Sequence, residues 1–120
     1  MLVVTALVLA VSFAGSVAAR RPATRVELAA LVHALPKAYR TGIAKAPTGC
    51  VMFVARVSAS GRYAEVTPRF SSRARCIRYA SDGFFLLRRT ATGWKTIYNG
   101  SDEPPCSLGV PRDLIACARS

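Results

Sequence analysis

The amino-acid sequence predicts an α+β domain in which a helix at about residues 24 to 36 packs on a four-stranded antiparallel sheet, closed by a short C-terminal helix and two disulfides. Three observations predict this fold. A helix-start motif followed by an apolar stripe precedes residue 36. From residue 50 onward, short runs of β-branched and aromatic residues alternate with turn residues. The same part of the chain contains four cysteines, an even number.

The first 19 residues differ in composition from the rest of the chain. They contain no charged side chain, are rich in Leu, Val and Ala, and end in small residues that suit signal-peptidase cleavage after Ala19. Residues 1 to 19 are therefore predicted to be a signal peptide, and residues 20 to 120 a single small disulfide-bonded domain that is secreted or held in the cell envelope. An uncleaved N-terminal membrane anchor is the alternative, because the apolar run nearly reaches the roughly 20 residues that span a bilayer.

The predicted helix begins at Thr24-Arg25-Val26-Glu27, which has the S/T-x-x-E form of a capping box. The apolar residues that follow are spaced as one helical stripe suited to packing on a sheet: Leu28, Leu31, Val32 and Leu35. Pro36 should end or kink the helix, because proline lacks a backbone donor and clashes with the preceding turn. Glycine and proline at positions 42 to 49 predict that at least the second half of residues 37 to 49 is loop.

Residues 51 to 58 and 63 to 67 are predicted to be the first two strands. The link between them, residues 59 to 62, is too short for a parallel crossover, so the two strands must be antiparallel. Pro68 should terminate the second strand or mark it as an edge, because proline cannot donate to a strand ladder.

Three further elements are predicted after the second strand. Residues 76 to 79 are a possible third strand, and residues 84 to 90 and 94 to 98 form a hairpin around Ala91-Thr92-Gly93. Residues 111 to 117 are predicted to be the short terminal helix, with Pro111 in its first turn.

The cysteines Cys50, Cys76, Cys106 and Cys117 predict two disulfides in an exported chain. A local bridge between Cys106 and Cys117 is plausible and leaves Cys50 to pair with Cys76. In a simple meander, however, these two would lie on strands about 9 to 10 Å apart, beyond the reach of a disulfide. Either one of them lies beyond its strand end, or one of them pairs with the C-terminal segment.

The charge of the chain is strongly basic, with a formal net charge of +11 that lies wholly outside the predicted signal peptide. Such a surface attracts anionic polymers, lipid headgroups or nucleic acid. The densest basic stretch is a possible anion-binding groove bounded by Phe70 and Tyr79, and consists of Arg69, Arg73, Arg75 and Arg78. A solvated basic loop is the competing interpretation, because 14 of the 17 basic residues are Arg, as codon usage in a GC-rich genome favours.

No catalytic, cofactor-binding or metal-ligating residues are predicted. The single histidine, His33, has no nucleophile or carboxylate placed by local spacing to work with it. The cysteines contain no C-x2-C pair, which disfavours zinc. A mechanism with two carboxylates would require Glu65 to meet a loop acid in the fold.

The second half of the chain contains short motifs in a fixed order: Arg62-Tyr63-Ala64, Val66, Cys76, Gly93-Trp94, Gly100-Ser101, Cys106, Val110-Pro111 and Leu114. This order resembles that of a group of uncharacterised small exported proteins of high-GC Gram-positive bacteria, over about residues 51 to 117. The resemblance implies an exported α+β domain and supplies no activity or site residue. The charged lead-in and the basic residues 69 to 78 are not part of that pattern.

These observations predict a secreted or cell-envelope basic binding protein, not an enzyme, whose ligand is an anionic polymer, a cell-envelope component or another secreted protein. An inhibitor or decoy that presents a rigid loop, such as residues 99 to 111, is the first alternative. A small extracellular enzyme whose acids meet only in the fold is the second.

Overall fold

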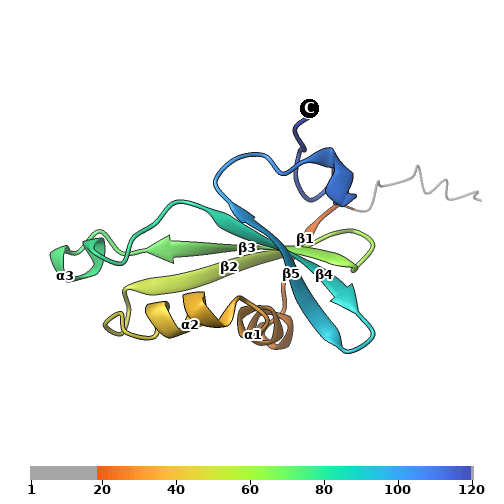
Figure 1. The fold of residues 1–120 in the computed structure, drawn as a ribbon. Coiled ribbons are helices and arrows are strands. Elements are labelled where there is room, and N and C mark those ends of the chain that lie inside the picture. The colour runs from red at the N-terminus through yellow and green to blue at the C-terminus, as the bar shows by residue number, and fades with distance from the viewer. Residues whose placement is uncertain (1–18, 120) are drawn as a thin grey trace, which may run out of the picture.

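The computed structural model describes residues 19–119 of the protein. A single antiparallel sheet forms the centre of this fold (Figure 1). Its five strands follow one another in chain order: β1 (Arg21–Pro22), β2 (Val51–Val57), β3 (Tyr63–Phe70), β4 (Phe84–Thr90) and β5 (Gly93–Gly100). Each strand is antiparallel to its neighbours. The α+β class is therefore confirmed, while the predicted signal peptide lies outside the described residues except for Ala19.

Four of the five strands match the predicted runs. The β4–β5 hairpin is confirmed, with Thr90 paired to Gly93 around a two-residue turn. A bulge interrupts this hairpin: Leu86 pairs with Tyr98 and Leu87 with Thr96, which leaves Ile97 as the extra residue. The fifth strand, β1, was not predicted; it is only two residues long and pairs with the end of β2 at Val57 and Arg56.

Two helices pack on one face of the sheet, which we call the inner face (Figure 1). Helix α1 (Arg25–His33) begins at the predicted capping box, in which the Thr24 hydroxyl accepts from the Glu27 backbone N–H. It is shorter than predicted because Pro36 prevents the chain from continuing as one helix, and α2 (Lys37–Ile43) begins just after that proline. Within residues 19–119, no helix combines the length and the apolar character needed to cross a bilayer.

The apolar core consists of two clusters on opposite faces of the sheet. The inner cluster joins the predicted helix stripe to the strands and contains Leu31, Leu35, Ala55, Val57, Ala64, Val66, Phe85 and Leu87. The outer cluster is centred on Leu86, Val110 and Leu114, so the C-terminal segment covers the opposite face of β4 and β5. Figure 1 shows this segment on the side of the sheet away from α1 and α2.

The predicted third strand at residues 76 to 79 is wrong. These residues lie in and after a short helix, α3 (Ala74–Ile77), in a loop that leaves the sheet. The Ser71 hydroxyl accepts from the Arg73 backbone N–H at 3.3 Å, a local turn that starts the helix. The β-branched and aromatic character of the segment was misleading, because the disulfide from Cys76 to Cys50 holds the segment away from the sheet.

The predicted terminal helix at residues 111 to 117 is also wrong. The chain instead makes a 3-10 helix, η1 (Cys106–Leu108), and a single turn in which Leu114 N–H donates to the Pro111 carbonyl at 3.1 Å. Two tertiary hydrogen bonds divert the backbone. The Asp113 carboxylate accepts from the Ala59 N–H at 2.8 Å, and the Ala118 N–H donates to the Pro104 carbonyl at 2.9 Å.

Of the pairings that the sequence left open, the structure contains Cys50 with Cys76 and Cys106 with Cys117. The Cα atoms of Cys50 and Cys76 are 5.2 Å apart, within the usual range. The geometric objection to this pair disappears because Cys76 lies on α3 and not on a strand, while Cys50 immediately precedes β2.

Pro68 lies within β3 and marks a free edge, as predicted. The strand continues to Phe70, but its pairing with β4 ends at Val66. On the β2 side, Ser58 N–H donates to the Tyr63 carbonyl and Ser71 N–H to the Cys50 carbonyl, so the alternation of the ladder turns the Pro68 nitrogen away from β2. The missing donor of Pro68 therefore falls on the unpaired side of the strand.

Candidate anion-binding site

The distal halves of β2 and β3 project beyond the rest of the sheet. Val51–Val54 pairs with Thr67–Phe70, whereas β4 pairs with β3 only up to Val66. Beyond this two-stranded ribbon the chain turns through α3, which lies at the far left of Figure 1. We call residues 50–54 and 67–80 the finger.

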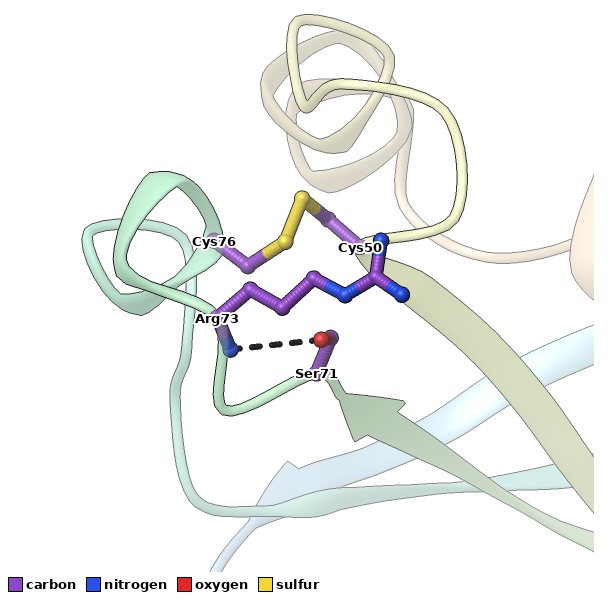
Figure 2. The surroundings of a disulfide bond; sticks show 4 residues. All are labelled: Cys50, Ser71, Arg73 and Cys76. Atoms are coloured by element: carbon purple, nitrogen blue, oxygen red, sulfur yellow. Dashed lines mark hydrogen bonds between the residues drawn. A yellow bond between two sulfur atoms is a disulfide. The ribbon is translucent and has the colours of Figure 1, made fainter.

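The Cys50–Cys76 disulfide fixes the loop at the tip of the finger. Figure 2 shows this bond together with the hydrogen bond from the Arg73 backbone N–H to the Ser71 hydroxyl. The Ser71 N–H donates to the Cys50 carbonyl at 2.9 Å, and the Cys76 side chain is fully buried. The tip is therefore held at the start of β2 by the covalent bond to Cys50 and by the backbone hydrogen bond from Ser71 to the same residue.

The four arginines of the predicted groove all lie on the finger and are all exposed. Arg69 is on β3, Arg73 precedes α3, Arg75 is within it and Arg78 follows it. The Arg78 guanidinium lies 5.1 Å from the centroid of the Tyr79 ring. Among residues 19–119, the one ion pair within 4.0 Å joins Arg21 to Glu27, so all four arginines carry charge without an acidic partner in that range.

Exposed apolar side chains accompany these arginines, and the sequence analysis did not single them out. In the described part of the chain, the large apolar residues that are exposed are Val26, Met52, Val54 and Ile77. Three of these four are on the finger, with Met52 65% exposed and Ile77 60% exposed. Met52 pairs in register with Arg69, which places both on the outer face of the ribbon. Nothing in the sequence distinguishes Met52 from its neighbours, because Val51–Val54 is a continuous apolar run.

Two shallow hollows lie beside Arg69. One of about 280 Å³ is lined by Met52, Arg69 and Phe70 among others, and one of about 400 Å³ is lined by Arg69, Phe70 and Asp82 among others. Phe70 is half-buried and lines both hollows. Asp82 brings one acidic side chain to the base of the finger.

A second basic cluster lies at the opposite end of β3, and the sequence analysis did not predict it. Arg62, Arg88 and Arg89 line a hollow of about 370 Å³ together with Tyr63 and Thr90. Arg88 and Arg89 point to opposite faces of β4, as expected from strand geometry, and Arg62 lies beside them in the β2–β3 turn, where its carbonyl accepts from the Arg89 backbone N–H at 2.7 Å.

The residues of the other hypotheses are dispersed. His33 is exposed at the last position of α1, and Glu65 lies in the middle of β3, in register with Arg56 and Leu86. The inhibitor hypothesis required residues 99 to 111 to project as a loop. Pro104 and Val110 in this segment are buried, and the segment packs on the outer face of the sheet. In residues 19–119, no group of three or more His, Cys, Asp or Glu side chains is arranged to hold a metal ion.

Fold and site together define a small α+β protein with a five-stranded antiparallel sheet, two disulfides and a basic projecting finger. No protein-family model, curated protein or solved structure matches the chain.

Proposed function

We propose that this protein is an exported basic binding protein that recognises an anionic component of the cell envelope through the finger. The observation that supports this most directly is the group Arg69, Arg73, Arg75 and Arg78, exposed on a disulfide-fixed projection and free of acidic partners among the described residues. Binding, and not catalysis, is the activity that such a surface favours, because a row of guanidinium groups supplies charge and hydrogen-bond donors but no group that accepts protons at neutral pH.

The disulfide contributes to binding by limiting the conformations of the free loop. A flexible basic loop would lose conformational entropy on contact with its ligand, whereas a loop already fixed loses less. The finger also places its charges at the end of a ribbon, where they reach a large anionic surface before the rest of the molecule does. The attraction should weaken with salt, because the Debye length falls from about 10 Å at 0.1 M to about 3 Å at 1 M.

The test is retention on a heparin column, with heparin as a soluble-polyanion probe. We expect the protein to bind and to elute with salt, and the variant Arg73→Glu, Arg75→Glu, Arg78→Glu to elute at clearly lower salt. These side chains are exposed, and none makes a side-chain hydrogen bond to another of residues 19–119.

The matched control reverses three exposed arginines outside the finger, Arg25→Glu, Arg62→Glu and Arg112→Glu, and changes the net charge equally. If both variants elute at the same salt, retention depends on total charge alone, and the finger has no special role.

The compartment is part of the same proposal. Disulfides persist in oxidising compartments and are rare in the cytosol, and residues 1 to 19 have the composition of a signal peptide. We expect the intact mass of protein recovered from culture medium to correspond to a chain that begins at Arg20, with two disulfides. A full-length chain with reactive thiols would contradict the proposal.

A further inference from the structure

We propose that the anionic surface recognised by the finger is that of a lipid bilayer, on which the arginines contact headgroups while Ile77 and Met52 enter the interface. This inference rests on the proposed function and adds the chemical class of the partner. The apolar side chains of the finger support it, because binding to a soluble polyanion does not require them.

The distribution of exposed apolar residues carries the inference. Of the four large apolar side chains exposed among residues 19–119, three are on the finger and the fourth, Val26, is on α1. The same projection holds four exposed arginines. A bilayer interface offers phosphate groups beside acyl chains, and so satisfies both kinds of side chain at once. A polymer in water satisfies the arginines only.

Met52 and Ile77, the two most exposed apolar side chains of the finger, are each close to an arginine. Ile77 is the last residue of α3 and directly precedes the exposed Arg78. Met52 is in register with Arg69 on the outer face of the ribbon, and the two line the same shallow hollow. The disulfide holds α3 against the start of β2, so these pairs belong to one rigid tip.

The two kinds of contact are individually weak and become effective together. A single short apolar insertion gives marginal, reversible membrane binding, and stable association needs a second signal such as a basic patch. Each arginine close to an anionic membrane strengthens binding by about fivefold. Arg62, Arg88 and Arg89 at the other end of β3 lack an exposed large apolar neighbour, so that cluster does not provide the second signal.

The experiment measures sedimentation of the full chain with vesicles of equal parts phosphatidylglycerol and phosphatidylcholine, and with vesicles of phosphatidylcholine alone. We expect binding to the anionic vesicles and little to the neutral ones. The double variant Met52→Ser, Ile77→Ser should weaken vesicle binding by about tenfold or more, because the apolar contact is lost. It should leave heparin retention unchanged, because the arginines remain.

Two controls support this comparison. Val26→Ser removes the most exposed large apolar residue outside the finger, which is 81% exposed, and should change neither readout. Ile77→Leu keeps an apolar side chain at the tip and should retain vesicle binding. Both positions of the double variant are largely exposed, so equal thermal melting of variant and parent is expected and confirms that the fold is kept.

The outcomes separate the two proposals. Retention on heparin without binding to anionic vesicles, or vesicle binding that the double variant leaves intact, overturns the membrane inference and leaves the proposed function standing. Failure to bind both heparin and anionic vesicles overturns both.

Discussion

The Glu27 side chain connects two elements of the fold. Its carboxylate accepts from the Arg21 guanidinium at 2.6 and 2.8 Å and from the Thr24 backbone N–H at 3.0 Å. It therefore completes the capping box of α1 and holds the short strand β1 beside that helix. The hydrogen bonds from Arg21, and next those from Thr24, lower the pKa of Glu27 from 4.5 to about 2.

This lowered pKa predicts a loss of stability in acid. Because the folded-state pKa lies below the unfolded one, the contribution of Glu27 is complete above about pH 4.5 and is lost as the pH falls toward 2. Glu27→Gln should lower the free energy of unfolding at pH 7 by about 1 kcal/mol, since glutamine can still cap but does not carry charge. The difference between parent and variant should vanish near pH 2, as measured by denaturant unfolding at several pH values.

Glu103→Gln is the control for this prediction, because Glu103 is an exposed loop carboxylate that makes no described hydrogen bond. A difference between parent and Glu27→Gln that stays constant from pH 7 to pH 2 would contradict the role assigned to the Arg21 contact.

At the scale of elements, the features that were predicted correctly are those that depend on residues close together in the chain. The capping box at Thr24 and the β4–β5 hairpin depend on residues close together in the chain, and both form as predicted. Strand β1 could not be predicted, because two residues become a strand only when the edge of β2 accepts them. The segment at residues 76 to 79 was mistaken for a strand because its side chains suit one, whereas the tie to Cys50 holds it away from the sheet.

The disulfide of the finger should act locally. The double variant Cys50→Ser, Cys76→Ser opens a loop closed over a separation of 26 residues and should cost about 3 to 4 kcal/mol. We expect backbone amide exchange to accelerate over residues 71 to 80 while the β4–β5 hairpin keeps its protection, because the hairpin packs on both apolar clusters. Exchange mass spectrometry measures both regions in one experiment.

The corresponding variant at the other disulfide, Cys106→Ser with Cys117→Ser, should show the reverse pattern. It frees the C-terminal segment that covers Leu86, so exchange should rise at β4 and stay slow in the finger. Equal acceleration everywhere in both variants would mean that the disulfides stabilise the molecule only globally.

At the scale of the whole molecule, the apolar core is divided into two small clusters, one on each face of the sheet. The C-terminal segment is held on the outer face by the Cys106–Cys117 disulfide and by two hydrogen bonds. The Asp113 carboxylate accepts from the Ala59 N–H, and the Arg20 guanidinium donates to the Leu114 carbonyl at 3.0 Å. Reduction breaks this disulfide and also the Cys50–Cys76 disulfide of the finger. We therefore expect a reductant to lower the melting temperature by more than about 10 °C, since each native disulfide contributes about 2 to 5 kcal/mol in domains of this size. An unchanged melt would contradict this view.

The candidate site was predictable in part for a physical reason. Arg69, Arg73, Arg75 and Arg78 are close in sequence and charged, so they remain near one another and exposed in any fold. The exposed apolar side chains of the finger were not predictable, because Met52 and Ile77 are 25 positions apart in the sequence and either could have been a buried core residue. The Arg62, Arg88 and Arg89 cluster likewise depends on strand pairing, which the sequence predicts only in outline.

The position of the finger also decides how the protein can be attached to a biosensor. Strand β1 and the Asp113 contact hold residues 21, 22 and 113 near the Val57 end of β2, while the tip of the finger lies beyond Val51, about 20 Å away along the strand. A biotin or linker attached near Arg20 or near Arg119 would therefore orient the immobilised protein with its basic tip toward the solution. Coupling through surface lysines would not guarantee that orientation, because the chain has only three lysines and none is on the finger.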